Sequence, residues 1–167
     1  MHLPLMLRLS GWGTLLSDVA AWGAIHAASG YGAHRLPLER LERDGWLLRP
    51  RRFELESRFY TRRLRVQHWK DKLPEAGALF PGGVSKRRLD GDLAGNLGRF
   101  VCETRRAERA HWLALAGSPL FALWNPLVGL VAMVTYGVLD NAPFIVVQRF
   151  NRQRAQRVMA ARSARRP

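Results

Sequence analysis

The sequence predicts an all-α integral membrane protein with about three membrane spans and one amphipathic helix in the membrane interface. The spacing of charge carries this prediction. Between Arg8 and Arg35 the only formal charge is Asp18, and between Arg109 and Arg149 the only one is Asp140. A helix that crosses a bilayer needs about 20 apolar residues, and both intervals are long enough to supply them.

The net charge supports the same class. The chain has 27 Lys and Arg against 13 Asp and Glu, giving +14, an excess typical of nucleic-acid or anionic-membrane partners. Basic residues concentrate in 35–109 and 149–166, as the positive-inside rule predicts for a multi-pass protein. We therefore expect a single membrane domain over 1–167 in the cell membrane. Its basic segments and C-terminus are cytoplasmic, membrane lipids are its partners, and no nucleic acid binds.

We predict that residues 9–31 form the N-terminal membrane span. A cleavable signal is the alternative, but the apolar stretch is longer than the usual signal core of about 7–15 residues. Asp18, Trp22 and His26 recur at four-residue spacing and so share one helix face. They predict either a polar contact inside a helix bundle, or a capping Asp18 with His26 near the lipid headgroups.

Segment 35–109 predicts two helices at the cytoplasmic surface. Residues 53–70 form the longest uninterrupted candidate, amphipathic and rich in arginine, which indicates an interfacial helix; a merely solvated basic helix is the alternative. Residues 90–112 form the second, capped by Asp90 or Asp92 and entering the bilayer near Trp112.

Residues 113–148 predict a helical hairpin of two short spans. Gly117-Ser118-Pro119 and Trp124-Asn125-Pro126 provide the break. Basic segments flank the run on both sides, so the number of crossings must be even; a re-entrant pair of helices satisfies the same rule. Residues 149–167 predict a basic tail attracted to lipid.

The chemistry of the chain centres on Glu108 and His111. At 100° per residue they share one helix face with Thr104. A histidine near a carboxylate can act as general base toward a hydroxyl, as acyl transfer to an alcohol requires; a structural ion pair at a polar helix end is the alternative. Several arginines are candidates to hold an anionic donor or an oxyanion: Arg105, Arg106, Arg149 and Arg152.

The sequence offers little support for other chemistries. Cys102 is the only cysteine, so neither an intrachain disulfide nor a cysteine-based zinc cluster can form. The chain also lacks a P-loop, a dinucleotide-binding glycine motif, a serine elbow and a paired-histidine zinc helix. We expect no metal and no cofactor.

Two long motifs resemble those of the glycosyl-4,4'-diaponeurosporenoate acyltransferase family. They are 103–108 (ETRRAE) followed by His111-Trp112, and 141–154 (NAPFIVVQRFNRQR). Shorter matches are Arg35-Leu36-Pro37, Phe53-Glu54 and Trp69-Lys70. The resemblance implies a small membrane enzyme of staphyloxanthin-type carotenoid biosynthesis, which esterifies a sugar hydroxyl of a lipophilic glycosylated acceptor. A fatty acyl-CoA or acyl carrier protein is then the co-substrate.

The resemblance also implies a set of site residues. We expect His111 as base and Glu108 as the residue that orients it, with Glu103 as a rival orienter. Phe150 stands where the family pattern leads us to expect tyrosine. The expected substrate-binding residues are Arg105, Arg106, Trp112, Trp69, Lys70, Asn141, Gln148, Arg149, Asn151 and Arg152.

Two other classes stay open from the sequence. A non-catalytic membrane subunit that assembles a carotenoid or cell-envelope enzyme would use the same polar helix faces as an interface. A basic nucleic-acid binder would leave the membrane without detergent and would bind DNA in a salt-sensitive way.

Overall fold

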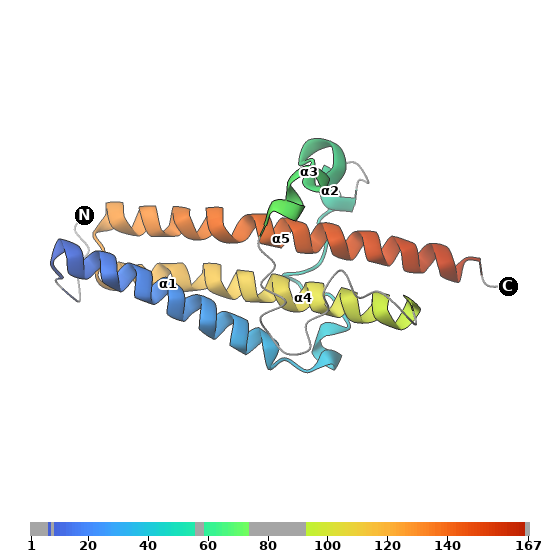
Figure 1. Ribbon diagram of the computed structural model, residues 1–167, viewed down its shortest axis with the longest axis horizontal. Helices are drawn as coiled ribbons and strands as arrows, with labels where there is room; N and C mark the ends of the chain where they lie inside the picture. Colours follow the sequence, from blue (N-terminus) through green and yellow to red (C-terminus); the bar gives the residue numbers. More distant parts are fainter. Residues whose placement is uncertain (1–6, 8, 56–58, 74–92, 166–167) are drawn as a thin grey trace.

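Three long helices lie side by side and form the body of the protein (Figure 1). The computed structural model describes residues 7, 9–55, 59–73 and 93–165. The long helices are α1 (Gly11–His34), α4 (Leu93–Gly117) and α5 (Leu127–Ser163). Helix α4 packs mainly against α5, and α1 packs against α4. The described residues contain no strand, so the predicted all-α class is confirmed.

Helix α1 covers most of the predicted N-terminal span. Ser10 caps it, because its Oγ accepts a hydrogen bond from the backbone N–H of Gly13 at 3.2 Å. Asp18 and Trp22 are buried on one face. The Asp18 carboxylate accepts from Trp124 Nε1 at 2.8 Å and from Asn125 Nδ2 at 2.7 Å. Asp18 therefore makes the polar contact inside the bundle, and it does not cap a shorter helix.

The predicted reversal of the chain after α4 is present. A short 3₁₀ helix, η5 (Ser118–Leu123), follows Gly117 and carries Pro119 in its first turn, and α5 begins after Pro126. Helix α5 then continues well past residue 148, with Pro143 inside it. The basic tail predicted over 149–167 forms the second half of α5 as far as Ser163, and Ala155 packs there against Leu97 and Val101 of α4.

The number of membrane spans is not confirmed. Among the described helices, only α5 is both long enough and apolar enough to cross a bilayer. The mean hydropathy of α1 is lowered by Asp18, His26 and several glycines. The mean hydropathy of α4 is lowered by the charged side chains in the two turns that follow Gly98.

The prediction of one interfacial helix over 53–70 is wrong. The chain forms four short turns there: α2 (Arg52–Leu55), the π-helical η2 (Phe59–Arg63), α3 (Val66–Trp69) and η3 (Lys70–Lys72). Arg65 has φ 47°, a left-handed conformation that ends one turn and starts the next. Tyr60 and Val66 instead pack against Val147 and Phe150 of α5, so tertiary packing replaces a continuous helix.

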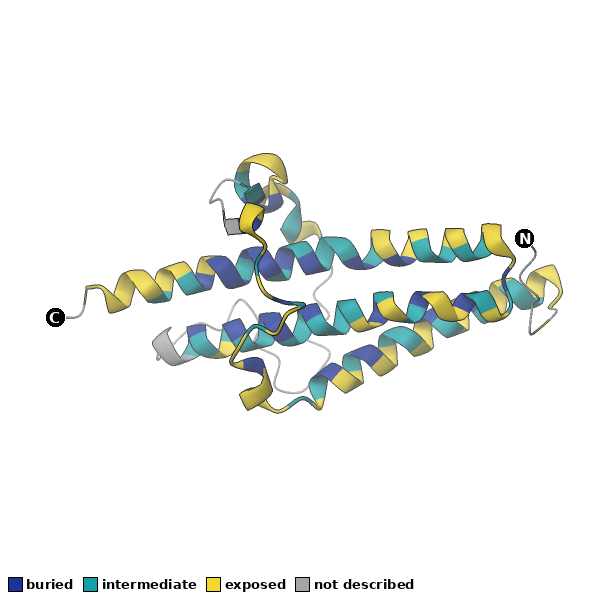
Figure 2. Ribbon diagram, turned by 180° about the vertical axis from the view of Figure 1, so that it is seen from behind, coloured by how far each residue is buried: buried dark blue, intermediate teal, exposed yellow. Residues whose placement is uncertain are grey.

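The connection before these turns contains one further short helix, η1 (Leu38–Leu41). Asp90 and Asp92, the expected caps of helix 90–112, lie outside the described residues, and α4 runs on to Gly117. Figure 2 shows the consequence for packing. Buried residues form a band along the middle of α4 and α5, and exposed residues cover the outer faces of the helices.

Candidate functional site

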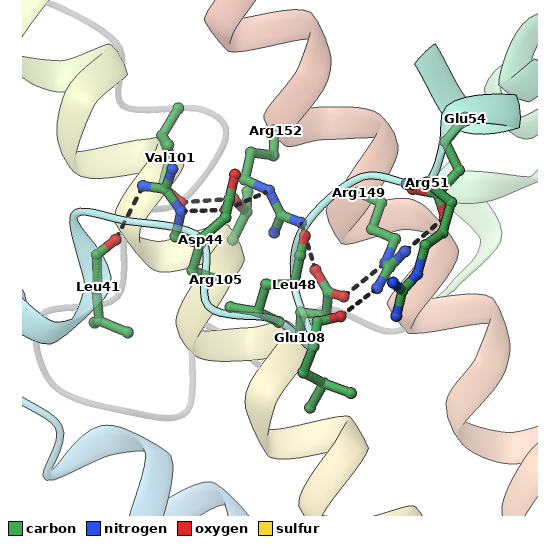
Figure 3. Close-up of polar contacts among 12 residues, drawn as sticks. Leu41, Asp44, Leu48, Arg51, Glu54, Val101, Arg105, Glu108, Arg149 and Arg152 are labelled. Atoms are coloured by element: carbon green, nitrogen blue, oxygen red, sulfur yellow. Dashed lines mark hydrogen bonds and ion pairs between the residues drawn. The ribbon is translucent and has the colours of Figure 1, made fainter. Parts of the chain in front are cut away.

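A buried cluster of arginines and carboxylates lies at the middle of the bundle (Figure 3). Its centre is Glu108 of α4, which is 0% exposed. Arg149 Nε lies 2.6 Å from Glu108 Oε1, and Arg152 Nη2 lies 2.7 Å from Oε2. Both arginines come from α5, so the Glu108 carboxylate joins the two longest helices.

The same arginines hold the connecting segment between α1 and α2. Arg149 reaches Glu54 Oε1 at 2.5 Å and the backbone carbonyl of Leu47 at 2.8 Å. Arg152 donates to the carbonyl of Leu48 at 2.9 Å. Glu54 in turn accepts from the backbone N–H of Arg51 at 2.8 Å. Charged hydrogen bonds at this burial are strong, and they fix the connection to α5.

Arg105, which precedes Glu108 by one turn of α4, completes the cluster. Its Nε lies 2.7 Å from Asp44 Oδ1, and its Nη1 donates to the carbonyl of Leu41 at 2.9 Å. Asp44 also lies 3.6 Å from Arg152 Nε. We call the six residues Asp44, Glu54, Arg105, Glu108, Arg149 and Arg152 the arginine cluster.

His111 belongs to a second group of side chains. Its Nδ1 lies 3.0 Å from Oδ1 of Asn141, which is fully buried on α5. Asn141 Nδ2 donates to the carbonyl of Gly137 at 2.9 Å, so the amide oxygen must be the atom that faces the imidazole. An amide oxygen only accepts, and therefore His111 Nδ1 carries hydrogen and Nε2 of the neutral ring keeps its lone pair.

Aromatic packing fixes the plane of the His111 ring. Phe144 stacks on it with centroids 4.7 Å apart and an interplanar angle of 11°. His26 Nε2 of α1 lies 3.2 Å from Asp140 Oδ2, and Asp140 immediately precedes Asn141 on α5. The arrangement presents one oriented imidazole with a basic nitrogen, which is what a general base requires.

Comparison with known proteins identifies the family. Residues 44–161 match the profile of glycosyl-4,4'-diaponeurosporenoate acyltransferase. The chain belongs to this family. A relative of that name from Staphylococcus aureus strain Newman is 28% identical over 107 residues, 64% of each chain. Another from a bovine strain of the same species is 26% identical over 125 residues, 75% of each chain.

The match to the family is partial in length. The chain covers 64% of the length of the first of these Staphylococcus aureus relatives. No solved structure matches the chain. The matched region contains the arginine cluster, His111 and Asn141, so both groups of side chains fall within what this chain shares with the acyltransferase family.

The structure separates two residues that we expected to act together. The Glu108 carboxylate faces Arg149 and Arg152 and accepts from Trp112 Nε1 at 3.2 Å, and the partner of His111 is Asn141. Glu103 pairs with Arg106 at 3.3 Å along α4. Neither glutamate orients the imidazole in this structure, because both carboxylates are engaged by arginines.

The remaining expected residues lie in several places. Arg106 also donates to the backbone carbonyl of His34 at the end of α1. Trp69 donates to the carbonyl of Leu64 at 2.9 Å and packs beside Tyr60 and Val66, while Lys70 pairs with Asp71 at 2.6 Å. Gln148 and Asn151 are half-buried on α5. No hydrogen bond or ion pair joins any of these side chains to His111 in the part of the chain that the structure describes.

Sequence reasoning missed Asp44 as a member of the cluster and identified Glu54 only as part of a short motif. A signal existed, since each is an acidic residue within a strongly basic segment. Phe144 was likewise noticed only inside a motif. Among the described residues no group of three His, Cys, Asp or Glu side chains could hold a metal ion, and Cys102 is a free thiol.

Proposed function

We propose that this protein is a membrane acyltransferase that transfers a fatty acyl group to a sugar hydroxyl of a glycosylated carotenoid or a similar glycolipid. The family supplies the reaction class, because the relatives are named as acyltransferases of glycosyl-4,4'-diaponeurosporenoate. The single observation that carries the mechanism is the 3.0 Å contact between His111 Nδ1 and Asn141 Oδ1, which leaves Nε2 as a base.

The outer surface of one half of the bundle supports a location in the membrane. Only 22% of the apolar stretch of α5 is buried inside the protein, so it does not resemble the core helix of a soluble domain. Large apolar side chains are exposed on all three long helices and on η5 in this half: Leu15, Leu16, Val19, Leu113, Leu120, Val128, Val131, Val138 and Leu139. We infer that α1, the end of α4 and the first half of α5 lie in lipid.

The opposite half carries the charge. Residues 35–55 and 59–65 contain many exposed arginines and run beside the middle of the bundle (Figure 1). Basic segments remain on the cytoplasmic side of bacterial membranes, so the proposal places this half and the C-terminus there. His111 then lies near the boundary, where a lipid-soluble acceptor and an amphiphilic donor can both reach it.

His111 acts on the sugar hydroxyl in the proposed reaction. Nε2 removes the hydroxyl proton as the sugar oxygen attacks the acyl carbonyl carbon of a thioester donor. A new C–O ester bond forms, the C–S bond breaks, and the imidazolium returns its proton to the leaving thiolate. Asn141 Oδ1 accepts the Nδ1–H bond throughout and so stabilises the imidazolium. Phe144 prevents the ring from turning.

The arginine cluster has a structural part in this proposal. Arg105, Arg149 and Arg152 each pair with a carboxylate and donate to a backbone carbonyl within the chain. They hold α4 and α5 in register, and this register places His111 against Asn141.

The experiment compares His111→Gln with His68→Gln, which changes an exposed histidine. Each variant is expressed in cells that make the glycosylated acceptor, and the membrane lipids are analysed for the acyl ester. We expect His111→Gln to reduce ester formation by about 10²–10⁴-fold and His68→Gln to leave it unchanged. Full ester formation with His111→Gln, at equal protein levels, would remove His111 as the base.

A further inference from the structure

Four side chains of α1 and α5 pack against one another in the half of the bundle that carries the exposed apolar surface. His26 Nε2 lies 3.2 Å from Asp140 Oδ2. One turn earlier on each helix, the rings of Trp22 and Tyr136 meet with their centroids 5.2 Å apart, and the Trp22 ring also stacks on His26 at 5.5 Å. We call Trp22, His26, Tyr136 and Asp140 the α1–α5 quartet. The proposed mechanism uses none of these side chains.

The polar members of the quartet are open to the outside of the protein. The His26 and Asp140 side chains are 37% and 36% exposed. The large side chains exposed beside Asp140 on α5 are apolar or aromatic, namely Tyr136, Val138 and Leu139. Apart from their contact with each other, His26 and Asp140 make no hydrogen bond or ion pair within the described part of the chain. The pair is therefore accessible from outside the bundle.

An accessible ion pair is unfavourable where lipid surrounds it. This inference rests on the proposed function, which places α1 and the first half of α5 in lipid. A carboxylate has lone pairs for several hydrogen bonds, and hydrocarbon cannot supply the donors that a single imidazole leaves missing at Asp140. Ionisable groups within membrane segments usually face protein or water and mark functional sites. A polar group that reaches the pair from the membrane would remove this cost.

We propose that the α1–α5 quartet binds the sugar of the glycolipid acceptor. Sugar hydroxyls donate to a carboxylate, and they both donate to and accept from an imidazole, so Asp140 and His26 suit them chemically. Tyr136 is 48% exposed one turn before Asp140 and offers an aromatic surface to the apolar face of a sugar ring. A few polar groups within an apolar and aromatic surround are typical of small-molecule sites.

The quartet lies beside the residue that orients the proposed base. Asp140 and Asn141 are consecutive on α5 and point about 100° apart, the first toward α1 and the second toward His111 of α4. Trp22 packs against Gly137, whose backbone carbonyl accepts from Asn141 Nδ2 at 2.9 Å. The inference thus assigns the acceptor side of the proposed reaction to the quartet, which holds the sugar while His111 activates its hydroxyl.

The test measures lipid retention without turnover. The full chain is reconstituted in phosphatidylcholine nanodiscs with monoglucosyl diacylglycerol and diacylglycerol, which share their chains and differ in the sugar. After extraction in a polyoxyethylene detergent, which carries no sugar, the two retained lipids are quantified over a range of glycolipid fractions. Asp140→Asn and His26→Gln are compared with Thr135→Val, which removes an exposed hydroxyl from the same part of α5. Thermal unfolding confirms that each variant is folded.

We expect the unchanged protein to retain the glycolipid in preference to diacylglycerol. Asp140→Asn should weaken this retention about 10–100-fold because a charged acceptor is lost, and Thr135→Val should leave it unchanged. His26→Gln should also weaken it, and this variant tests the same site if Asp140→Asn does not fold. No preference for the glycolipid by the unchanged protein, or equal retention by the folded quartet variants and Thr135→Val, would overturn the proposal.

The sugar site and the proposed function can fail separately. Binding does not need the base, so His111→Gln should retain the glycolipid as well as the unchanged protein does, while ester formation falls. Selective retention without ester formation by the unchanged protein would support the sugar site and oppose the acyltransferase. Ester formation with the same KM for the acceptor in Asp140→Asn and Thr135→Val would oppose the sugar site alone.

Discussion

The Glu108 carboxylate lies 2.7 Å from the Arg152 guanidinium, and their side chains are 0% and 1% exposed. Two opposite charges at this depth stabilise the fold only as a pair, because each loses its hydration and depends on the other for compensation. The pair also fixes how α4 meets α5, since one residue belongs to each helix. The register of this contact brings His111 to Asn141 further along the same two helices.

Replacing Glu108 should therefore destabilise the protein. Glu108→Gln keeps the volume but removes the charge that Arg149 and Arg152 share, and we expect a loss of about 3–5 kcal/mol. Thermal unfolding in detergent measures it. Glu103→Gln is the control, because Glu103 is partly exposed and pairs with Arg106, and this replacement should cost at most about 1 kcal/mol. Equal stabilities of the two variants would contradict a structural role for the buried pair.

Asn141 should affect the proposed reaction through the imidazole. Asn141→Ala removes the acceptor for Nδ1–H of His111, so kcat should fall. The fall should be smaller than in His111→Gln, which removes the base itself. Asn141→Asp keeps an acceptor and adds a negative charge that favours the imidazolium, which should move the acid limb of the pH–rate profile to higher pH. If both variants keep the kcat and the pH–rate profile of the unchanged protein, Asn141 has no part in catalysis.

Gly137 should tolerate no larger side chain. A Cβ added there would lie 2.7 Å from Cη2 of Trp22, whose ring is held between Phe121 and Tyr136. We expect Gly137→Ala to lower the free energy of unfolding by about 1–3 kcal/mol. Gly98→Ala in α4 is the matched change, since a Cβ there meets nothing within 4 Å, and it should gain up to about 1 kcal/mol. The difference in unfolding midpoint checks the contact.

The contact between Asp18 and the η5–α5 junction should be needed for the hairpin. Asp18 is buried and accepts from both Trp124 and Asn125. Asp18→Ala leaves the buried Asn125 amide and the half-buried Trp124 N–H without their acceptor, so we expect a loss of about 2–4 kcal/mol in unfolding free energy. Thr14→Ala, on the exposed part of α1, serves as the control and should cost much less. Limited proteolysis between α4 and α5 reports the local effect, and unchanged cleavage would oppose it.

Tyr60 should make the stability of the protein sensitive to alkaline pH. Burial, and then the negative charge of Glu54, raise the pKa of its hydroxyl far above the usual value of about 10. The unfolded chain loses this proton above about pH 10 while the folded chain keeps it, so stability falls as pH rises beyond that point. Tyr60→Phe should show a smaller loss over the same range. Identical alkaline curves would mean that Tyr60 ionises freely.

Much of the architecture followed from the sequence alone. The long intervals with a single charge predicted the helical content, and the proline-containing breaks at Ser118-Pro119 and Asn125-Pro126 predicted the reversal between α4 and α5. The four-residue spacing of Asp18 and Trp22 predicted a shared buried face. These features succeed because helical periodicity and proline act locally, over a few residues.

Only the tertiary structure decided which charges meet. On one helix Glu108 and His111 share a face, and the sequence therefore paired them. In the folded protein Arg149 and Arg152 reach Glu108 from α5, because a buried carboxylate gains more from two guanidinium groups than from an imidazole. His111 contacts Asn141 instead of Glu108. Segment 53–70 forms short turns because its apolar side chains pack against α5. The sequence determined the three long helices and their polar faces, and packing between helices determined the partner of each polar side chain and the shape of segment 53–70.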